Sequence, residues 1–521
     1  MKYIILIFLV ILVNESLAQY PNIMITNTGS PNEPSICMNP KNTNQIVAGS
    51  NLNFYYYSTN GGYSWTKATL TSSYSVWGDP ALTVDTAGNF YYGHLTNPSS
   101  SYFIDRIVVQ KSTNGGMNWD NGAYAGFIPP KQQDKEWLCV DPATNNIYMT
   151  WTQFDSYGSS NPADSSVILF SKSTNAGASW TTVKRINKIA GDCVDEDNTV
   201  EGAVPCVGPN GQIYTSWSGP LGIVMNMSTN MGETWLPMER FVTTQPEGWD
   251  YSIPGIYRAN GLPVTACDIS NGPYRGNIYI NWTDQRNGPA DTDVWLIKST
   301  DGGLTWGTVK RVNDDPPGKQ QFFTWMTVDQ TNGYLYFVFY DRRNYSNNQT
   351  DVYMAMSSNG GETFVNFKVS ESPFTPSSGV FFGDYTNVTA HDGKVRPIWT
   401  RLNSGSLSLH TAIVDFVMGI TQVSSSIPDN YKLYDNYPNP FNPSTRIKFD
   451  IAKANATFTL YPVSMIIYDA NGKEIQKLFE ANVLPGTYEV EWNATEFSTG
   501  AYYCKLTAPG YSESKLMILI K

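Results

Sequence analysis

The stretch Ser299-Thr300-Asp301-Gly302-Gly303-Leu304-Thr305-Trp306 decides the fold, because close copies of it occur five more times. The copies share a Ser, an Asn or Asp two residues later, a glycine and a closing aromatic, and they span 58–65, 112–119, 173–180, 228–235 and 357–364. An apolar run such as Val294 to Ile297 leads into the turn. Since Asn, Asp and Gly tolerate a left-handed backbone at low steric cost, each copy predicts a β-hairpin.

These residues resemble the Asp-box (BNR) repeat, Ser-x-Asp-x-Gly-x-Ser/Thr-Trp/Phe, of sialidases and other β-propeller proteins. Five copies carry Asn at the Asp position, and only Asp301 matches it. The resemblance implies a β-propeller in which these turns lie on the rim and are structural. Because proteins of quite different function share the repeat, it implies no particular activity.

A second repeat sets the number of blades. It is a hairpin with an Asp/Asn-x-x-x-Gly/Asn turn and a Tyr-rich second strand, at 35–49, 81–94, 137–151, 203–217, 264–282, 324–339 and 386–399. We therefore expect an all-β protein with a propeller over 19–420, with seven blades favoured and six possible. The last hairpin has no Ser-x-Asn/Asp turn after it, so Asn22 to Thr26 is expected to complete that blade and close the ring.

Composition limits the partners and the compartment. A net charge of -11 with 15% charged residues argues against nucleic-acid binding. Residues 1–18, with an apolar run from Tyr3 to Val13 and the end Ser16-Leu17-Ala18, predict a secretory signal peptide. No later stretch is long and apolar enough for a transmembrane helix, and we expect a monomer. Four of the six cysteines, Cys37, Cys139, Cys206 and Cys267, suit buried positions in first strands. Cys193 and Cys206 are near enough in sequence to pair, but spacing does not decide this.

The chain changes character after a predicted linker at 421–433. The proline-rich stretch Tyr437 to Ser444, the turn Asp469 to Glu474 and the segment Gly500 to Tyr503 separate alternating strands that predict a small Ig-like β-sandwich over 434–521. This part resembles the C-terminal sorting domain of type IX secretion. The resemblance implies export across the outer membrane by that machinery, with the domain commonly cleaved or exchanged for a surface anchor.

One series of polar residues is expected at the mouth of the central channel, on the face opposite the repeated turns. It follows the second strand of several blades and comprises Gln153, Asp284, Arg286, Asp341, Arg343 and Arg401. Guanidinium groups there could bind the carboxylate of an acidic sugar. Alternatively, because the Asp-x-Arg pair recurs in successive blades, it stabilises its own loop, and this interpretation is favoured for Asp284/Arg286 and Asp341/Arg343.

Residues that occur once are better catalytic candidates. Arg401 stands where other blades have Asp, Asp384-Tyr385 opens the seventh blade, Glu201 opens the fourth and Asp134-Lys135-Glu136 opens the third. Sialidases use an arginine triad, a Tyr nucleophile assisted by Glu, and an Asp acid/base. By residue type, that resemblance implies catalytic roles for Tyr385, Glu201 and Asp384, and substrate binding by Arg286, Arg343 and Arg401 with Asp284 and Asp341. The family's Arg-Ile-Pro motif is absent from this sequence.

The sequence leaves several functions open. One hypothesis is a sialidase-like glycoside hydrolase; the alternative is a non-catalytic propeller that binds glycan or protein, and a third is a polysaccharide lyase with Tyr385 as base. The connection 245–263 carries aromatics suited to stacking on sugars or simply to packing. No metal or organic cofactor is expected, apart from a possible structural calcium ion at the carboxylate-rich connection Asp192 to Asp197.

Overall fold

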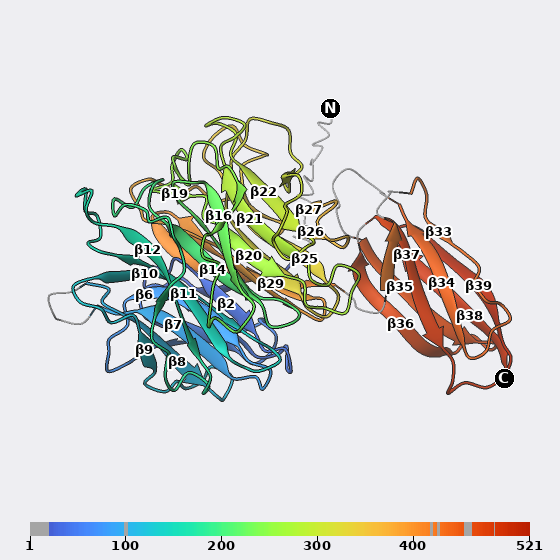
Figure 1. The fold of residues 1–521 in the computed structure, drawn as a ribbon. Coiled ribbons are helices and arrows are strands. Elements are labelled where there is room, and N and C mark those ends of the chain that lie inside the picture. The colour runs from blue at the N-terminus through green and yellow to red at the C-terminus, as the bar shows by residue number, and fades with distance from the viewer. Residues whose placement is uncertain (1–19, 98–102, 417–419, 425–427, 453–460, 484) are drawn as a thin grey trace, which may run out of the picture.

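The computed structural model describes residues 20–97, 103–416, 420–424, 428–452, 461–483 and 485–521. The regular elements in these residues are strands, which form a ring of sheets and a smaller sandwich (Figure 1). The predicted signal peptide lies outside the described residues. The described residues contain no helix with the length and apolar character needed to cross a membrane.

Six blades are four-stranded antiparallel sheets whose strands follow one another in chain order from the innermost to the outermost. The first three are β2 (Ser35–Met38), β3 (Ile46–Ser50), β4 (Phe54–Ser58) and β5 (Thr66–Thr69); β6 (Gly78–Val84), β7 (Phe90–Leu95), β8 (Ile107–Ser112) and β9 (Ala123–Ala125); and β10 (Gln132–Val140), β11 (Ile147–Phe154), β12 (Ser166–Ser173) and β13 (Lys184–Arg185). The next three are β14 (Glu201–Val207), β15 (Ile213–Ser218), β16 (Ile223–Ser228) and β17 (Arg240–Thr243); β20 (Val264–Cys267), β21 (Ile278–Asp284), β22 (Asp293–Ser299) and β23 (Lys310–Arg311); and β24 (Gln321–Asp329), β25 (Tyr334–Asp341), β26 (Asp351–Ser357) and β27 (Val365–Lys368). Between the fourth and fifth blades, β18 (Asp250–Tyr251) pairs with β19 (Ala259–Asn260).

The seventh blade joins the two ends of the propeller. It contains β28 (Asn387–His391), β29 (Lys394–Asn403) and β30 (Ser406–Ala412), and β1 (Asn22–Thr26) pairs antiparallel with β30 as its outer strand, while β31 (Val414–Asp415) pairs with β29. The innermost strands contact one another in sequence, and β2 contacts β28, so the ring is closed. Seven blades and closure by the N-terminal strand are confirmed, and the six-blade alternative is wrong.

The repeated turns have a structural hydrogen-bond pattern. In the fourth blade, Ser228 Oγ accepts from the N–H of Gly232 at 2.9 Å and donates to Asn230 Oδ1, which in turn accepts from the N–H of Thr234 at 2.9 Å. Gly232 has φ +77°, and a Cβ there would lie 2.3 Å from the ring of Phe170 in the third blade. The turn therefore requires glycine both for its backbone and for close contact between neighbouring blades.

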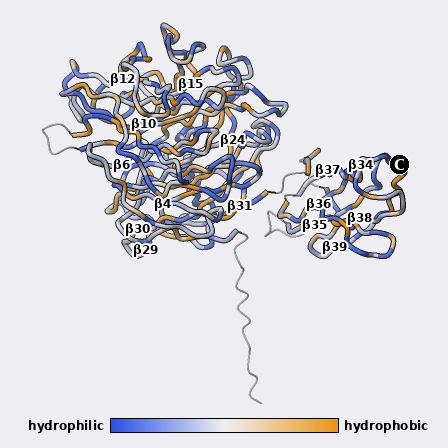
Figure 2. Tube along the Cα trace, turned by 90° about the horizontal axis from the view of Figure 1, so that it is seen from below, coloured by the Kyte–Doolittle hydropathy of each residue, from blue (hydrophilic) through white to orange (hydrophobic). Residues whose placement is uncertain are grey.

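The second part is the predicted β-sandwich. One sheet has the order β32 (Ile420–Ser424), β37 (Gly486–Asn493), β34 (Ser444–Ile451) and β33 (Lys432–Leu433), and the other has β36 (Glu474–Val483), β35 (Tyr461–Asp469), β38 (Gly500–Ala508) and β39 (Tyr511–Leu519). Hydrophobic and hydrophilic residues are interspersed along the chain of this part (Figure 2), buried positions alternate along β37 and β38, and the inward residues of both sheets share one core around Trp492. The predicted linker, 421–433, is wrong in part, because β32 and β33 belong to this sandwich.

Candidate functional site

The central channel of the propeller is open toward one face and closed toward the other. We call the face with the Ser-x-Asn/Asp turns the turn face, and the face with the connections between blades the connection face. A cavity of about 490 Å³, lined by all seven innermost strands, lies toward the turn face. Near the connection face the rings of Trp137, Trp325 and Tyr385 fill the channel, with 4.4 Å between the Trp137 and Trp325 centroids and 5.2 Å between those of Trp137 and Tyr385. The mouth on the connection face is therefore plugged by aromatic side chains.

A repeated β-bulge shapes this mouth. In four blades the innermost strand carries one extra residue at its connection end, between Gly78 and Ala81 and at the corresponding places of β10, β14 and β24. Asp79, Lys135, Gly202 and Phe323 lie within these bulges and have φ between 50° and 78°, and Glu33 has φ 50° two residues before β2. Bulges re-aim side chains, and here Glu33, Asp79 and Lys135, from three consecutive blades, come together.

The resulting charged group centres on Lys135, and we call it the mouth cluster: Glu33, Asp79, Asp134, Lys135, Glu201, Arg258 and Asp384. The Nζ of Lys135 lies 2.8 Å from Asp384, 3.2 Å from Asp79 and 3.7 Å from Glu33. Asp384 also accepts two hydrogen bonds from the guanidinium of Arg258. Two cations thus hold one aspartate, and five further acidic side chains, including nearby Asp195, lie around them.

Burial and neighbouring charges shift the pKa values of these carboxyl groups in opposite directions. Burial raises the pKa of Asp384, but the charges of Lys135 and Arg258 outweigh it, so the pKa lies below its usual range. Burial and the neighbouring Asp195 and Asp134 raise the pKa of Glu201 well above its usual value. Burial also raises the pKa of Asp134 to about 7, although Lys135 opposes it. The two cations therefore favour the ionised form of Asp384, and burial favours the protonated form of Glu201.

The predicted catalytic residues Tyr385, Glu201 and Asp384 all lie at this mouth, but Tyr385 and Glu201 are not partners. Tyr385 lines a cavity of about 30 Å³ and Glu201 one of about 40 Å³, each with room for roughly two or three waters. No hydrogen bond joins the two among the described residues, and Asp384 lines both cavities. Burial and the carboxylates of Asp79 and Glu33 raise the pKa of Tyr385, which is the opposite of what an activated phenolate nucleophile requires.

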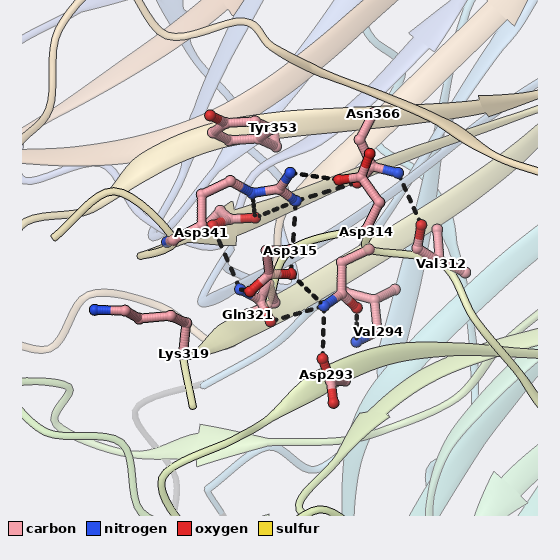
Figure 3. A network of polar contacts seen from close by, with 12 residues as sticks. Asp293, Val294, Val312, Asp314, Asp315, Lys319, Gln321, Asp341, Tyr353 and Asn366 are labelled. Carbon is pink, nitrogen blue, oxygen red and sulfur yellow. Dashed lines mark hydrogen bonds and ion pairs between the residues drawn. The ribbon is translucent and has the colours of Figure 1, made fainter. Parts of the chain in front are cut away.

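The predicted substrate-binding residues lie away from this mouth, in their own loops. Arg286 donates from Nε to Asp284 Oδ1 at 2.8 Å and from its terminal nitrogen to Asp284 Oδ2 at 2.6 Å. Arg343 donates to Asp341 at 2.8 Å and to Asp314 at 2.5 Å, within the polar network of Figure 3. The interpretation of these pairs as loop stabilisers agrees with these contacts. Neither pair lines the two small cavities of the mouth, and their expected position around the channel stays a prediction.

Arg401 and the acidic connection also have local hydrogen-bond partners, although Arg401 Nε is buried without a partner among the described residues. Arg401 donates to Ser372 Oγ at 2.7 Å and to the carbonyl of Pro373 at 3.1 Å, with no contact to Arg286 or Arg343 among the described residues. Asp192 accepts from the hydroxyl of Thr199 at 2.9 Å, and Asp197 accepts from the N–H of Asp250 at 2.8 Å. In the described part of the chain no three His, Cys, Asp or Glu side chains are arranged to hold a metal ion, and a calcium site here stays a prediction. In the described residues the six cysteines form no disulfide bond.

Sequence reasoning missed a group of exposed aromatics at the connection end of the second blade. We call it the blade-2 aromatic surface: Tyr74, Trp77, Phe103, Tyr124 and Phe127. The rings of Trp77, Phe103, Tyr124 and Phe127 are each 38–43% exposed. For Tyr74, Trp77, Phe103 and Phe127 the available signal was a large aromatic side chain in a loop, since a strand position already explains an aromatic by burial; Tyr124 lies in β9 and gave no such signal.

The buried acids of the mouth predict an unusual pH dependence of stability. Asp134, with a pKa near 7 in the fold and about 3.9 when unfolded, binds its proton more tightly in the folded state. Its contribution is therefore fully present below about pH 4 and is lost as the pH rises toward 7. Asp134→Asn keeps the acceptor for the Lys135 N–H, 2.8 Å away, and should raise thermal stability relative to the parent at pH 8 more than at pH 5. A difference in melting temperature between the two proteins that stays constant from pH 5 to 8 would contradict this.

Comparisons with known proteins identify the family of the second part. Residues 435–521 match the family described as secretion system C-terminal sorting domain. This domain indicates secretion by the type IX system to the cell surface or outside, so the protein is an exported seven-bladed β-propeller with a sorting domain. No curated protein matches the chain.

Solved structures resemble the chain only distantly. A Hadza microbial sialidase, Hz136, has 13% identity and a TM-score of 0.42, with 71% of this chain and 73% of that one covered. A protein of unknown function from Dyadobacter fermentans has 12% identity and a TM-score of 0.43, covering 76% and 98%. An α-L-arabinanase from Penicillium chrysogenum, complexed with arabinobiose, has 13% identity and a TM-score of 0.38, covering 61% and 92%. Similarity at this level says nothing about the activity of this chain.

Proposed function

We propose that this exported propeller recognises carbohydrate on its connection face without cleaving it. The observation that carries the proposal is the local neutralisation of the arginines: Arg286 and Arg343 are each bonded to an aspartate of their own loop. An arginine triad for a sugar carboxylate needs free guanidinium groups that converge on one ligand. Exposed aromatic rings at the connection end of the second blade offer the remaining surface for a ligand.

The closed mouth also argues against hydrolysis of a glycosidic bond at this site. A sugar ring does not fit in cavities of about 30 and 40 Å³, and Tyr385 lies in the aromatic plug rather than beside an open site. General acid and base groups must come within hydrogen-bond reach of the scissile bond. In this arrangement the connection 245–263, which carries Arg258, would have to move before any glycosidic oxygen could reach Asp384 or Glu201.

One observation favours a glycoside hydrolase as a second candidate. Asp384, whose pKa is lowered, and Glu201, whose pKa is raised, line the same small cavity of the mouth, and pairs of acids with opposite pKa shifts mark acid and base roles in glycosidases. For this candidate, Asp384 would act as nucleophile or general base, and Glu201 would act as general acid. It also requires an opening of the mouth.

The test compares binding with turnover by the full exported chain. We expect retention of glycans on an array and no release of fluorophore from 4-methylumbelliferyl sialoside, glucoside, galactoside or arabinofuranoside at high protein concentration. Turnover that disappears in Tyr385→Phe, Glu201→Gln or Asp384→Asn, with the fold intact by circular dichroism, would establish the hydrolase instead. Absence of both binding and turnover would overturn carbohydrate recognition altogether.

A further inference from the structure

Three rings of the blade-2 aromatic surface, Tyr74, Tyr124 and Phe127, lie against the arginine of an ion pair. The guanidinium of Arg106 lies 3.9 Å from the ring centroid of Phe127 and 4.8 Å from that of Tyr124. Behind the rings, Arg106 donates to Asp105 at 3.0 and 2.6 Å, and Asp105, only 1% exposed, also accepts from the hydroxyl of Thr96 at 2.6 Å. The rings of Tyr124 and Phe127 therefore pack on a side chain that is itself held in place, which reduces the entropy that these two rings lose on binding.

The rings of the blade-2 aromatic surface meet edge to face, so they remain partly exposed to solvent. Trp77 and Phe103 meet edge to face, with centroids 5.9 Å apart at 86°, and Tyr124 and Phe127 do the same at 6.2 Å and 83°. Tyr74 packs its ring against the Tyr124 edge at 5.2 Å. In an edge-to-face pair, one ring turns its face away from its partner, and these four rings each keep about 40% of their surface in solvent. Flat apolar faces are thus presented at fixed angles.

Charge at this surface is balanced. The one guanidinium among the rings, Arg106, is neutralised by Asp105 and is only 16% exposed. A ligand carboxylate would find no free cation here, and a ligand cation would meet the charge of Arg106. Exposed polar groups lie next to Tyr74 in the chain: Ser73 accepts from the side chain of Asn121 at 2.8 Å, and Ser72 donates to the Asn121 carbonyl at 2.9 Å. Uncharged donors and acceptors therefore border the rings.

From these features we propose that the blade-2 aromatic surface binds uncharged pyranose units of a glycan, stacked on Trp77 and Phe127. This inference rests on the proposed function and gives it a place and a ligand class. A pyranose has an apolar C–H face edged by hydroxyl groups, so it fits a flat ring bordered by hydroxyls and amides and needs no ion pair. Trp77 directly precedes the Gly78–Asp79 bulge, which sets the bound glycan beside the mouth cluster.

The experiment measures binding of neutral oligosaccharides to the full chain by calorimetry. The probes are cello-, xylo-, manno- and galacto-oligosaccharides, with sialyllactose as the acidic comparison. We expect at least one neutral probe to bind, and Trp77→Ala and Phe127→Ala each to weaken it by about tenfold or more. Tyr63→Ala, at a 56% exposed tyrosine in a Ser-x-Asn turn on the opposite face, serves as the matched control and should leave affinity unchanged. Unaltered melting temperatures verify the fold of each variant.

Each other outcome overturns a definite part of the inference. If a neutral probe binds both alanine variants as tightly as the parent, this surface is not the binding site, but the proposal of carbohydrate recognition is kept. Binding of sialyllactose alone removes the uncharged ligand class. If no oligosaccharide binds, the proposed function itself fails. In that case, loss of binding to an unglycosylated protein partner in the same two variants would assign the surface to protein recognition instead.

Discussion

Replacing Lys135 by Met is expected to destabilise the propeller by about 3–5 kcal/mol, because a buried charge that loses its partner is far costlier than the pair it came from. Lys135 is 8% exposed and contacts Asp384, Asp79 and Glu33, which belong to three different blades. Its removal leaves these carboxylates facing one another, with only Arg258 left as a counter-charge at Asp384. Thermal unfolding of the parent and the variant at pH 8 measures the effect.

Two further variants separate charge from simple loss of a lysine. Lys131→Met removes an ion pair with Asp155 whose lysine side chain is 40% exposed, and it should change stability by less than about 1 kcal/mol. Adding Glu33→Gln to Lys135→Met should restore part of the loss, because one acid fewer is then left unpaired. The loss at pH 5 should also be smaller than at pH 8, because burial and Asp79 raise the pKa of Glu33. Equal effects of Lys135→Met and Lys131→Met would contradict the central role of Lys135.

The architecture could be read from the sequence because it depends on local patterns that repeat. Each Ser-x-Asn/Asp turn and each hairpin specifies its own strand pairing, so seven hairpins predict seven blades whatever their distant contacts. The strand Asn22 to Thr26 had no hairpin partner of its own, and the seventh blade had no outer strand. Joining the two needed only the rule that exposed sheet edges are avoided.

The site was predicted only in part, because it depends on backbone geometry that no local pattern records. Glu201, Asp384 and Tyr385 were selected as residues that break the repeat, and they do lie at the mouth. Alignment of the second strands suggested that Asp284 and Asp341 would surround the channel, but the channel is lined by the first strands. The meeting of Glu33, Asp79 and Lys135 requires left-handed backbone at three non-glycine residues. Such conformations are rare for these residue types, so the sequence gives little reason to expect them.

Ring closure by β1 provides the second large effect: a chain that starts at Asn27 should lose at least about 5 kcal/mol of stability relative to one that starts at Gln19. Tyr20 and Ile25 are 3% and 8% exposed, and truncation of one buried side chain of this size already removes about 2–5 kcal/mol. The deletion also exposes the edge of β30, whose backbone pairs with β1 from Asn22↔Ala412 to Thr26↔Leu409. Amide hydrogen exchange should therefore accelerate first in β30, while β15, in the fourth blade, changes least.

The β30 edge that the deletion exposes allows a positive control, in which an added peptide replaces β1. An added peptide with the sequence of residues 19–26 should restore protection of β30, because it can pair with the same edge and refill the sites of Tyr20 and Ile25. A peptide in which Tyr20 and Ile25 are both Ala keeps the backbone partners and should fail. Met24→Ala in the full chain tests the opposite face of the strand, where Met24 is 53% exposed, and should leave the melting temperature unchanged. If the shortened chain remains monomeric with β30 fully protected, the N-terminal strand does not close the ring in solution, and the seventh blade must be stable as a three-stranded sheet.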